Sequence, residues 1–291
     1  MFPYSCKAIA QCTPAVFIFE NVKGLLRKSF STYFEYILLR LTYPELEIRS
    51  SEAWEDHLRR LERTHTSQKY NGVKYKVLFR LINAADYGVP QKRERVVLVG
   101  IRNDLDVEWS FPEQTHSLEA LIHTQFMTKE YWERHGIDPA DISCYDGRTA
   151  AFIQRLQKQP QLFPPATKAW RTVRDALQAV PQPDEEGTYH PEHILRKGAR
   201  SYPGHTGSFI DFPSKTIKAG GHGVPGGENM LRNADGSVRY YTTYEAKLLQ
   251  TFPDEYRITG SWTESMRQIG NAVPVKLARI IAGSLIDKIW C

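Results

Sequence analysis

The feature that most constrains this fold is a short run of apolar residues, Ala15-Val-Phe-Ile-Phe19. A continuous apolar run of this length indicates a strand buried on both faces, and such strands are typical of parallel sheets. Gly24 follows, and apolar residues then recur at intervals of three and four from Phe30 to Leu41, as on one face of a helix that Pro44 ends. We therefore expect a buried parallel strand followed by a helix that packs against it.

Two further strands are expected downstream of a charged excursion. Residues 45–72 are rich in charge and include one short amphipathic helix, whereas residues 76–82 and 95–101 have the apolar patterns of strands. The apolar residues expected on the buried face of the short helix are Trp54, Leu58 and Leu61. Strand, helix, strand, loop and strand in this order predict an α/β layer fold.

The character of the chain changes after about residue 103, where proline, glycine, histidine and aromatic residues become frequent. We interpret residues 103–237 as a second, irregular domain of short strands and loops. Helical patterns return at Thr243–Phe252 and from Pro274 to Trp290, and Pro274 suits a first helical turn because its missing N–H has no partner there. Residues 238–291 are therefore expected to return to the domain formed by residues 1–102.

Composition excludes several classes of protein. The chain has 291 residues, 41% hydrophobic and 12% aromatic, which indicates a globular rather than a disordered protein. Its net charge of +5 suits a polyanionic partner without identifying one. With neither a signal-peptide pattern nor an apolar run long enough to span a bilayer, we expect a cytoplasmic protein without a membrane partner. The spacing of its cysteines suggests neither a zinc site nor disulfides; they are Cys6, Cys12, Cys144 and Cys291.

Two patterns look functional but are rejected. His190 and His193 could ligate a metal on a helix, but Pro191 argues against a regular helix and no third ligand is placed nearby, so no metal is expected. The stretch from Gly221 to Gly226 matches G-x-G-x-x-G, yet its own proline and the glycines that follow prevent a helix from starting there. It is therefore not a dinucleotide-binding loop.

Two charged segments carry candidate chemistry. Glu20-Asn-Val22 stands where the first strand ends, the edge at which open α/β sheets bind ligands, and a carboxyl group beside apolar walls can act as an acid. In Gln91-x-Arg93-x-Arg95, alternation places these three residues on one face of an extended segment. An arginine there offers a planar fork of donors for a carbonyl or for holding Glu20. Taken alone, both segments are equally compatible with solvated strand ends.

Two glycine-containing segments could approach a ligand. Gly270-Asn-Ala-Val-Pro274 is expected to form the turn before the last helix, where small residues let the backbone come close to a bound molecule. The stretch Thr216–Met230 is glycine-rich, which allows its backbone to lie against a groove or a phosphate. An ordinary helix-capping turn and a long surface turn are the alternatives that the residues leave open.

Taken together and in this order, these segments from about residue 14 to 290 closely resemble the second half of a DNA cytosine-C5 methyltransferase. The resemblance implies an α/β fold: an incomplete Rossmann-like S-adenosylmethionine-dependent methyltransferase sheet with an inserted, irregular target-recognition domain. Residues 1–102 would be the C-terminal half of the catalytic domain, residues 103–237 the DNA-reading domain, and residues 238–291 the returning segment.

The resemblance also implies roles for individual residues. Glu20 would act at ring N3 of a flipped cytosine, Arg95 would contact its O2, and Arg93 would support the site or contact the DNA backbone. On the side of the cofactor, S-adenosylmethionine, the expected residues are Asn271, Gly270, Ala272 and Val273. On the side of double-stranded DNA they are Gln91, Lys218, Gly220, Gly221, His222 and Gly223.

The sequence departs from the family in two places. Tyr244 and Leu248 stand where the family usually has arginines, although Glu245 is kept, and these changes are expected to weaken packing or an ion pair. The cofactor loop and the Pro-Cys nucleophile that the family places before Glu-Asn-Val are also absent, and neither Cys6 nor Cys12 is assigned as a nucleophile. Met1 is accordingly interpreted as an internal methionine of a longer protein.

Three functions remain open at this point. The chain could be part of a methyltransferase that is inactive without a complementing N-terminal half, a non-catalytic DNA-binding subunit or truncated remnant, or an RNA methyltransferase of the same lineage. A sheet without its first strands would expose an apolar edge. We therefore expect poor solubility of the chain alone, and a monodisperse, cooperatively melting monomer would contradict that expectation.

Overall fold

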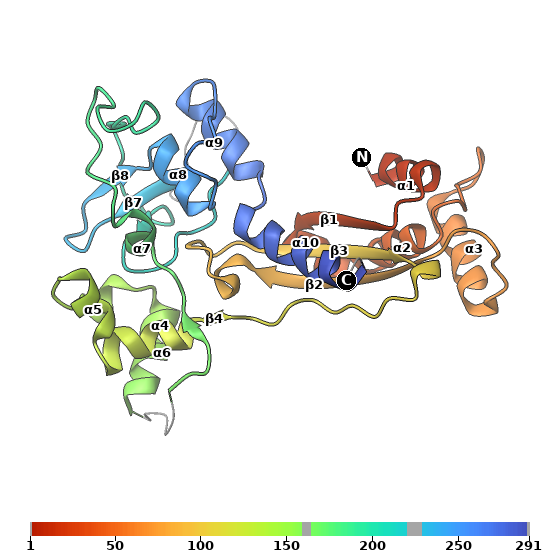
Figure 1. Ribbon diagram of the computed structural model, residues 1–291, viewed down its shortest axis with the longest axis horizontal. Helices are drawn as coiled ribbons and strands as arrows, with labels where there is room; N and C mark the ends of the chain where they lie inside the picture. Colours follow the sequence, from red (N-terminus) through yellow and green to blue (C-terminus); the bar gives the residue numbers. More distant parts are fainter. Residues whose placement is uncertain (1, 159–163, 220–228, 290–291) are drawn as a thin grey trace. The chain divides into compact units, whose positions relative to one another are not determined.

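The computed structural model describes residues 2–158, 164–219 and 229–289, and the chain divides into two compact units (Figure 1). The first unit contains Met1–Ile82, Glu94–Pro112 and Ile281–Cys291, and the second contains Asn83–Arg93 and Glu113–Ile280.

The first unit contains a three-stranded sheet with strand order β1-β3-β2 and helices packed on it. Its elements are α1 (Phe2–Cys12), β1 (Val16–Val22), α2 (Ser31–Thr42), α3 (Trp54–Ser67), β2 (Tyr75–Asn83) and β3 (Glu94–Arg102). The three strands and the helix before Pro44 therefore lie where the sequence predicts them, whereas α1 was not predicted. The helix α3 is longer than the short one expected, because its polar face continues well beyond Leu61.

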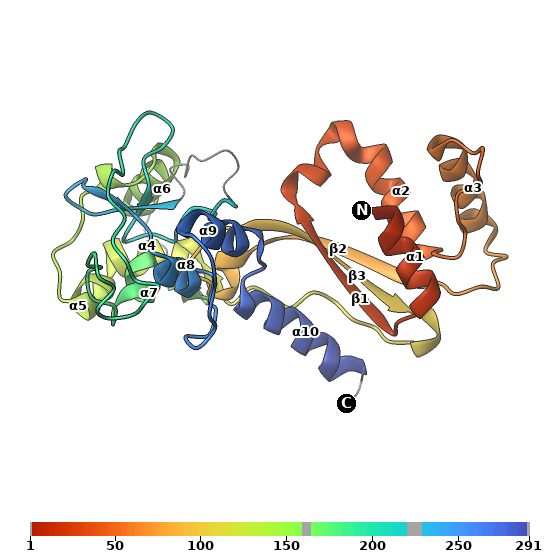
Figure 2. The same cartoon turned by 90° about the horizontal axis from the view of Figure 1, so that it is seen from above.

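The central strand β3 organises the core of this unit. Because β3 has a strand on each side, its side chains from Val96 to Val99 are almost fully buried on both faces of the sheet. The helices α1 and α2 pack on one face, where Cys6, Phe34 and Leu41 meet Val96 and Phe17 in one apolar cluster (Figure 2). This packing explains the three-and-four spacing of apolar residues in α2.

The prediction of a buried parallel strand at residues 15–19 is wrong in two respects. The strand β1 runs antiparallel to β3, with Val16 opposite Ile101 and Val22 opposite Arg95. It also lies at the edge of the sheet, so Ile18 and Val22 are 43% and 56% exposed. The direction of a strand depends on its neighbour, which an apolar run does not reveal.

The second unit is built from short elements joined by long connections. Its elements are β4 (His116–Ser117), α4 (Leu118–Ile122), α5 (Glu130–His135), α6 (Gly147–Lys158), β5 (Lys168–Ala169), α7 (Val173–Leu177), β6 (Ser208–Phe209), β7 (Met230–Arg232), β8 (Val238–Tyr240), α8 (Thr243–Leu249) and α9 (Trp262–Asn271). The last helix, α10 (Val275–Ile289), begins in the second unit and belongs to the first unit from Ile281 on. The predicted irregular character holds for the two-residue strands but not for α6, a helix of 12 residues. That helix was missed because Ile153 and its apolar neighbours lie in a stretch rich in loop-forming residues.

Two apolar clusters of described residues lie within the second unit. The second of them determines which residues group with this unit. One cluster surrounds Trp132, Tyr145 and Phe209. In the other, Ile217 and Leu231 pack against the buried faces of α8 and α9. Because of this packing, residues 238–280 group with the second unit, and the return to the first unit comes at Ile281 rather than at residue 238.

One helical stretch, Trp262–Ile289, is long and apolar enough by composition to cross a membrane, although the sequence suggested that no such run exists. It consists of α9 and α10, which are separate helices, and it is partly buried inside the protein. Core helices of soluble proteins pass the same test, so this stretch is weak support for a membrane span.

Candidate functional site

Glu20 and Arg95 form an ion pair at one end of the first unit's sheet. The antiparallel register places Glu20 opposite Val97 and Arg95 opposite Val22, so the two side chains start from neighbouring positions on adjacent strands. Arg95 Nε lies 2.5 Å from Glu20 Oε1, and the side chains are 13% and 25% exposed. Glu20 Oε1 is buried without a well-aligned hydrogen bond, although Arg95 Nε is close. The sheet thus holds a carboxylate beside a guanidinium at its surface.

Arg93 is buried inside the second unit, with 1% of its surface exposed. Its Nη2 donates to the Gly270 carbonyl at 2.8 Å and its Nη1 to the Ile217 carbonyl at 3.3 Å. These bonds join three segments that are far apart in the sequence. Arg93 therefore links the backbone of these segments and lies away from solvent.

The predicted alternation along Gln91-x-Arg93 is visible in the burial of the side chains. Gln91 and Arg93 are buried, whereas Lys92 is partly exposed and Glu94 is exposed. Both polar atoms of the Gln91 side chain are buried without a hydrogen-bond partner among the residues described. A buried amide without partners is costly, so Gln91 is an unfavourable point within this loop.

The segment that holds Gln91 is bonded to the segment that leads into the predicted DNA-reading stretch. Lys92 N donates to the Ser214 carbonyl at 2.8 Å, Ser214 N to the Pro90 carbonyl at 3.0 Å, and Thr216 Oγ1 to the Lys92 carbonyl at 2.8 Å. These hydrogen bonds place the backbone around Gln91 beside the segment that leads to Lys218, a candidate DNA contact. Sequence reasoning missed this juxtaposition, since no local pattern indicates the pairing.

Lys218 is exposed, and its backbone is held by one buried side chain that the sequence did not single out. Asn229 Oδ1 accepts from Lys218 N at 3.1 Å, and Asn229 Nδ2 donates to the Lys218 carbonyl at 3.3 Å. The other candidate DNA contacts, Gly220, Gly221, His222 and Gly223, lie outside the described residues.

The candidate cofactor residues lie at the junction of α9 and α10. Gly270 and Asn271 are the last residues of α9, not part of a free turn as expected, and the connection is Ala272–Pro274. A Cβ at Gly270 would lie 2.4 Å from Ala219 N, so glycine is required there for close packing of the backbone. Asn271 is exposed, and Ala272 and Val273 are partly exposed. These three residues offer an amide and a small apolar surface to a ligand, whereas Gly270 contributes through packing.

The surroundings of Tyr244 and Glu245 show how the chain accommodates the change at Tyr244. Glu245 accepts from Arg239 Nη1 and Nη2 at 2.7 and 2.6 Å and belongs to a capping box with Thr242 at the start of α8. Tyr244 is buried and packs on His190, with ring centroids 4.4 Å apart. Arg239 therefore supplies the ion pair that the changed positions were expected to weaken.

His193, one of the two histidines rejected as metal ligands, has other polar partners. His193 Nδ1 lies 2.9 Å from Thr242 Oγ1, and its Nε2 lies 2.9 Å from the Pro181 carbonyl. Among the described residues there is no group of three histidine, cysteine or acidic side chains that could hold a metal ion.

Of the described cysteines, Cys6 is fully buried in the apolar cluster of the first unit. Burial raises the pKa of its thiol to about 11, a rise that the charge of Arg40 only partly offsets. A thiol with this pKa is protonated at neutral pH and is a poor nucleophile. Cys12 is exposed at the end of α1, and Cys144 is partly exposed in the second unit.

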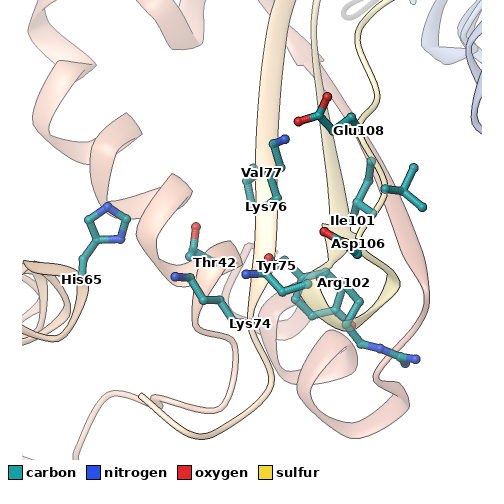
Figure 3. Close-up of a pocket in the computed structure, with 12 residues that line it drawn as sticks. Thr42, His65, Lys74, Tyr75, Lys76, Val77, Ile101, Arg102, Asp106 and Glu108 are labelled. Carbon is teal, nitrogen blue, oxygen red and sulfur yellow. The ribbon is translucent and has the colours of Figure 1, made fainter. Parts of the chain in front are cut away.

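A cavity of about 430 Å³ in the first unit lies at the end of the sheet away from Glu20 (Figure 3). It is lined by the start of β2 and the end of β3, including Lys74 and Ile101, and Ile101 pairs with the first residue of β1. Its lining mixes cations with Asp106 and Glu108. Because Glu20 stands near the opposite end of β1, this cavity is not part of the site formed by Glu20 and Arg95.

A cationic cluster beside the Gln91 loop leads to a pH-dependence prediction. Burial first, and then the charges of Lys276, Lys168 and Arg171, lower the pKa of His116 to about 4. The unfolded chain binds a proton near pH 6.5, so stability should be complete above that pH and decline as pH falls from 6.5 toward 4. We expect the free energy of unfolding in urea to fall by less than about 1.4 kcal/mol per pH unit from this one group.

The variant His116→Asn tests this assignment. Urea unfolding of the second unit between pH 7.5 and 4.5 should have a smaller slope against pH in the variant than in the unmodified chain. An unchanged slope would assign the acid sensitivity to other groups, such as His190, whose pKa is also lowered by burial.

Comparisons with known proteins cover nearly the whole chain. A family model described as C-5 cytosine-specific DNA methylase matches residues 55–287. The chain is 27% identical over 295 residues to the Type II methyltransferase M.BspRI of Lysinibacillus sphaericus, covering 98% of this chain and 54% of that protein. It is 28% identical over 293 residues to M.SacI of Streptomyces achromogenes, covering 97% and 63%.

Similarity to solved structures is weaker. The S. pombe Dnmt2 methyltransferase has 15% sequence identity with this chain and a TM-score of 0.46, covering 94% of this chain and 65% of that one. The chain spans between half and two thirds of the length of the curated relatives named above.

Proposed function

Because the chain belongs to the C-5 cytosine-specific DNA methylase family, we propose that it supplies the base-holding and DNA-reading parts of an enzyme that methylates cytosine at C5. The observation that carries the proposal is the pair formed by Glu20 and Arg95, held by adjacent strands with 2.5 Å between Arg95 Nε and Glu20 Oε1. The relatives are Type II methyltransferases, so the substrate we propose is a specific site in double-stranded DNA.

The pair suits the electronic demand of the reaction. Cytosine C5 becomes nucleophilic only after a thiolate adds at C6, and an enzyme reaches these atoms only when the base leaves the stack. Glu20 would act at ring N3, where a proton or hydrogen bond eases the addition. Arg95 would hold the O2 carbonyl with its planar fork of donors and keep Glu20 in place.

For the cofactor, the family uses S-adenosylmethionine, which supplies the methyl group when bound. Asn271 presents an exposed amide for a polar part of that molecule, and Ala272 and Val273 present apolar surface beside it. Gly270 would keep this end of α9 against the backbone of residues 218 and 219, since any side chain there would collide with it.

The second unit is proposed to read the DNA. Lys218 is exposed at the entrance to the glycine-rich stretch, and Gln91 has a buried amide that lacks a protein partner among the described residues. A lysine can contact phosphate, whereas the amide of Gln91 would have to become exposed before it could read a base edge. Within a bacterial cell, this role would place the protein in the cytoplasm at the nucleoid.

The catalytic thiolate is proposed to come from a segment that is not among these 291 residues. Cys6 is buried in a core cluster with a raised pKa, and the family's Pro-Cys dipeptide does not occur upstream of Glu20. Within the described residues, β1 pairs only with β3, which leaves its second edge available to another strand. A complementing methyltransferase segment could therefore add a strand beside β1 and cover Ile18 and Val22.

Hydrogen exchange tests this complementation. In the chain alone, backbone amides of β1 that point away from β3 should exchange rapidly, and they should become protected when the N-terminal half of a relative is added. The amides of α2 serve as the internal control, since they already bond within a helix. Unchanged exchange across β1 at saturating fragment would contradict strand addition at this edge.

A second candidate function is DNA binding without turnover. It is favoured by the placement of Cys6, because a buried thiol with a raised pKa is a poor nucleophile toward a bound base. Complementation distinguishes the two functions, because the enzyme part would then transfer methyl groups to bound DNA and the binding subunit would not.

Binding of defined nucleic acids tests the proposed substrate. We expect the chain to bind duplex DNA with an affinity that falls as salt rises, and Lys218→Ala to reduce the slope of log K against log salt by about one. The matched control is Lys197→Ala, which removes an exposed lysine that is paired with Glu185. Equal or tighter binding of duplex RNA would instead favour an RNA methyltransferase.

A further inference from the structure

The second unit contains a cavity of about 550 Å³ that the proposed function does not use. Its walls come from the segment around Cys144, from β6 and the residues after it, and from Lys92 and Arg232. We call it the Phe209 cavity, after the aromatic residue at its floor. Neither Arg93 nor the residues from 270 to 273 line it.

Three aromatic rings form a rigid floor. Tyr145 contacts Phe209 and Phe212 edge to face, with ring centroids 5.1 and 5.8 Å apart. All three side chains are buried in the same apolar cluster. The floor is therefore fixed by the packing of the unit and does not need a ligand to form.

Two cations lie over these rings, and a third, Lys215, lines the cavity. Lys92 Nζ lies 4.9 Å from the centroid of the Phe212 ring, and the Arg232 guanidinium lies 5.2 Å from that of Phe209. Lys215 Nζ donates to Thr206 Oγ1 at 3.1 Å, and the backbone ladder from Lys92 to Ser214 brings the two lysines onto neighbouring segments of the chain. The rings thus hold cationic heads in position by cation–π contact.

Among the described lining residues, the three cations Lys92, Lys215 and Arg232 stand against one carboxylate, which lies close enough to Lys92 to be affected by its charge. Asp146 is the one carboxylate among its lining residues in the described part of the chain, and its Oδ1 accepts from Thr149 N at 2.9 Å, at the start of α6. Neither Lys92 nor Arg232 forms an ion pair with any acidic side chain that the structure describes. A cavity of this kind favours an anionic ligand.

The combination of aromatic rings and cations indicates which kind of ligand the cavity would bind. A bare anion does not need an aromatic floor, and an apolar ligand would desolvate Lys92 and Arg232 without supplying a counter-charge. A nucleotide has both an anionic phosphate and a planar base, and bases stack on arginine as well as on aromatic rings. The cavity volume lies within the range of small-molecule sites.

We propose that the Phe209 cavity binds one nucleoside phosphate, with the phosphate at Lys92 and Lys215 and the base beside Arg232. An unpaired nucleotide in bound DNA and a free nucleotide have this chemistry in common. The first source rests on the proposed function, because it requires the second unit to bind DNA. In that case the cavity is distinct from the pair that would hold the reacting cytosine.

Cys144 provides a reporter at the rim, since it is partly exposed and lines the cavity. The full chain is labelled with N-ethylmaleimide, and modification of each cysteine is followed by mass spectrometry. The probes are a duplex with one unpaired 2-aminopurine, the same duplex fully paired, and deoxyadenosine monophosphate. Cys12, at the end of a helix in the other unit, is the internal reference.

We expect the duplex with the unpaired base to slow labelling of Cys144 but not of Cys12, and to bind about tenfold more tightly than the paired duplex. The double variant Lys92→Ala/Lys215→Ala should lose both effects, and Lys92→Arg/Lys215→Arg should restore them. Lys197→Ala, which removes a lysine outside the cavity, should change neither effect.

Two results would overturn the proposal and leave the proposed function intact: equal affinity for both duplexes, and an unchanged rate of Cys144 labelling with every probe. If neither duplex binds, the proposed DNA substrate is wrong, and the test of the cavity then depends on deoxyadenosine monophosphate alone. Protection of Cys144 by deoxyadenosine monophosphate that the double alanine variant loses would then support the cavity as a free-nucleotide site, and no protection would refute it.

Discussion

Replacing Arg93 with alanine should destabilise the second unit by about 3 kcal/mol or more. Arg93 is almost fully buried and donates to the carbonyls of Gly270 and Ile217. The substitution removes charge-assisted hydrogen bonds, leaves two buried carbonyls without these donors, and opens a cavity. The midpoint of urea unfolding, followed by fluorescence of the tryptophans, measures the loss.

Two variants test whether the planar guanidinium of Arg93, with its two hydrogen bonds, is responsible for this stability. Arg93→Lys keeps the charge but cannot reach two carbonyls with a planar fork, so it should recover less than half of the lost stability. Arg267→Ala removes an arginine from the surface of α9, where its partner is Glu264, and should leave the midpoint of urea unfolding nearly unchanged. Similar midpoints of urea unfolding for Arg93→Ala and Arg267→Ala would contradict the proposal that the hydrogen bonds of Arg93 stabilise the second unit.

Replacing Glu20 with glutamine should lower methyl transfer by about 10²- to 10⁴-fold in an enzyme reconstituted from this chain and a nucleophile-bearing segment. Glutamine keeps the size of the side chain and can accept a hydrogen bond from Arg95, but it cannot exchange a proton with the ring of the base. DNA affinity and the melting temperature should change little, because the pair is at the surface of the sheet. Transfer of tritium from labelled S-adenosylmethionine to duplex DNA measures the rate.

The control for Glu20→Gln is Glu94→Gln. Glu94 precedes Arg95, is exposed, and pairs with Lys23, so it offers the same chemical change on a neighbouring strand of the same sheet. We expect its rate to stay within about a factor of two of the unmodified enzyme. Equal losses in the two variants would mean that the carboxylate of Glu20 acts through general charge at the surface rather than at the base.

The sequence predicted the first unit well because its elements are specified by local patterns. The apolar residues of α2 at intervals of three and four and the apolar run of β3 locate these elements without knowledge of the rest of the chain. The direction of β1 could not be predicted in this way, because only its pairing with β3 determines it. The same limit applies to the boundary at Ile281, which depends on packing of α8 and α9 against distant residues.

The residues of the candidate site were found by pattern, but their environments were not. The partners of Arg93 lie 124 and 177 positions away, and no local signal announces them. Lys92 likewise lines the Phe209 cavity together with Phe209 and Arg232, which lie more than a hundred positions later in the sequence. Such sites arise from the meeting of separate segments, so a sequence can supply the residue types without showing which of them meet.

The most direct test is methyl transfer to duplex DNA by the 291-residue chain, alone and mixed with the Pro-Cys-containing N-terminal half of M.BspRI. We predict no transfer above background for the chain alone and transfer to cytosine C5 in the mixture, lost again with Glu20→Gln. Transfer by the chain alone would mean that one of its own cysteines is the nucleophile. Binding of DNA by a stable mixture that transfers no methyl groups would contradict the enzyme and leave a DNA-binding subunit.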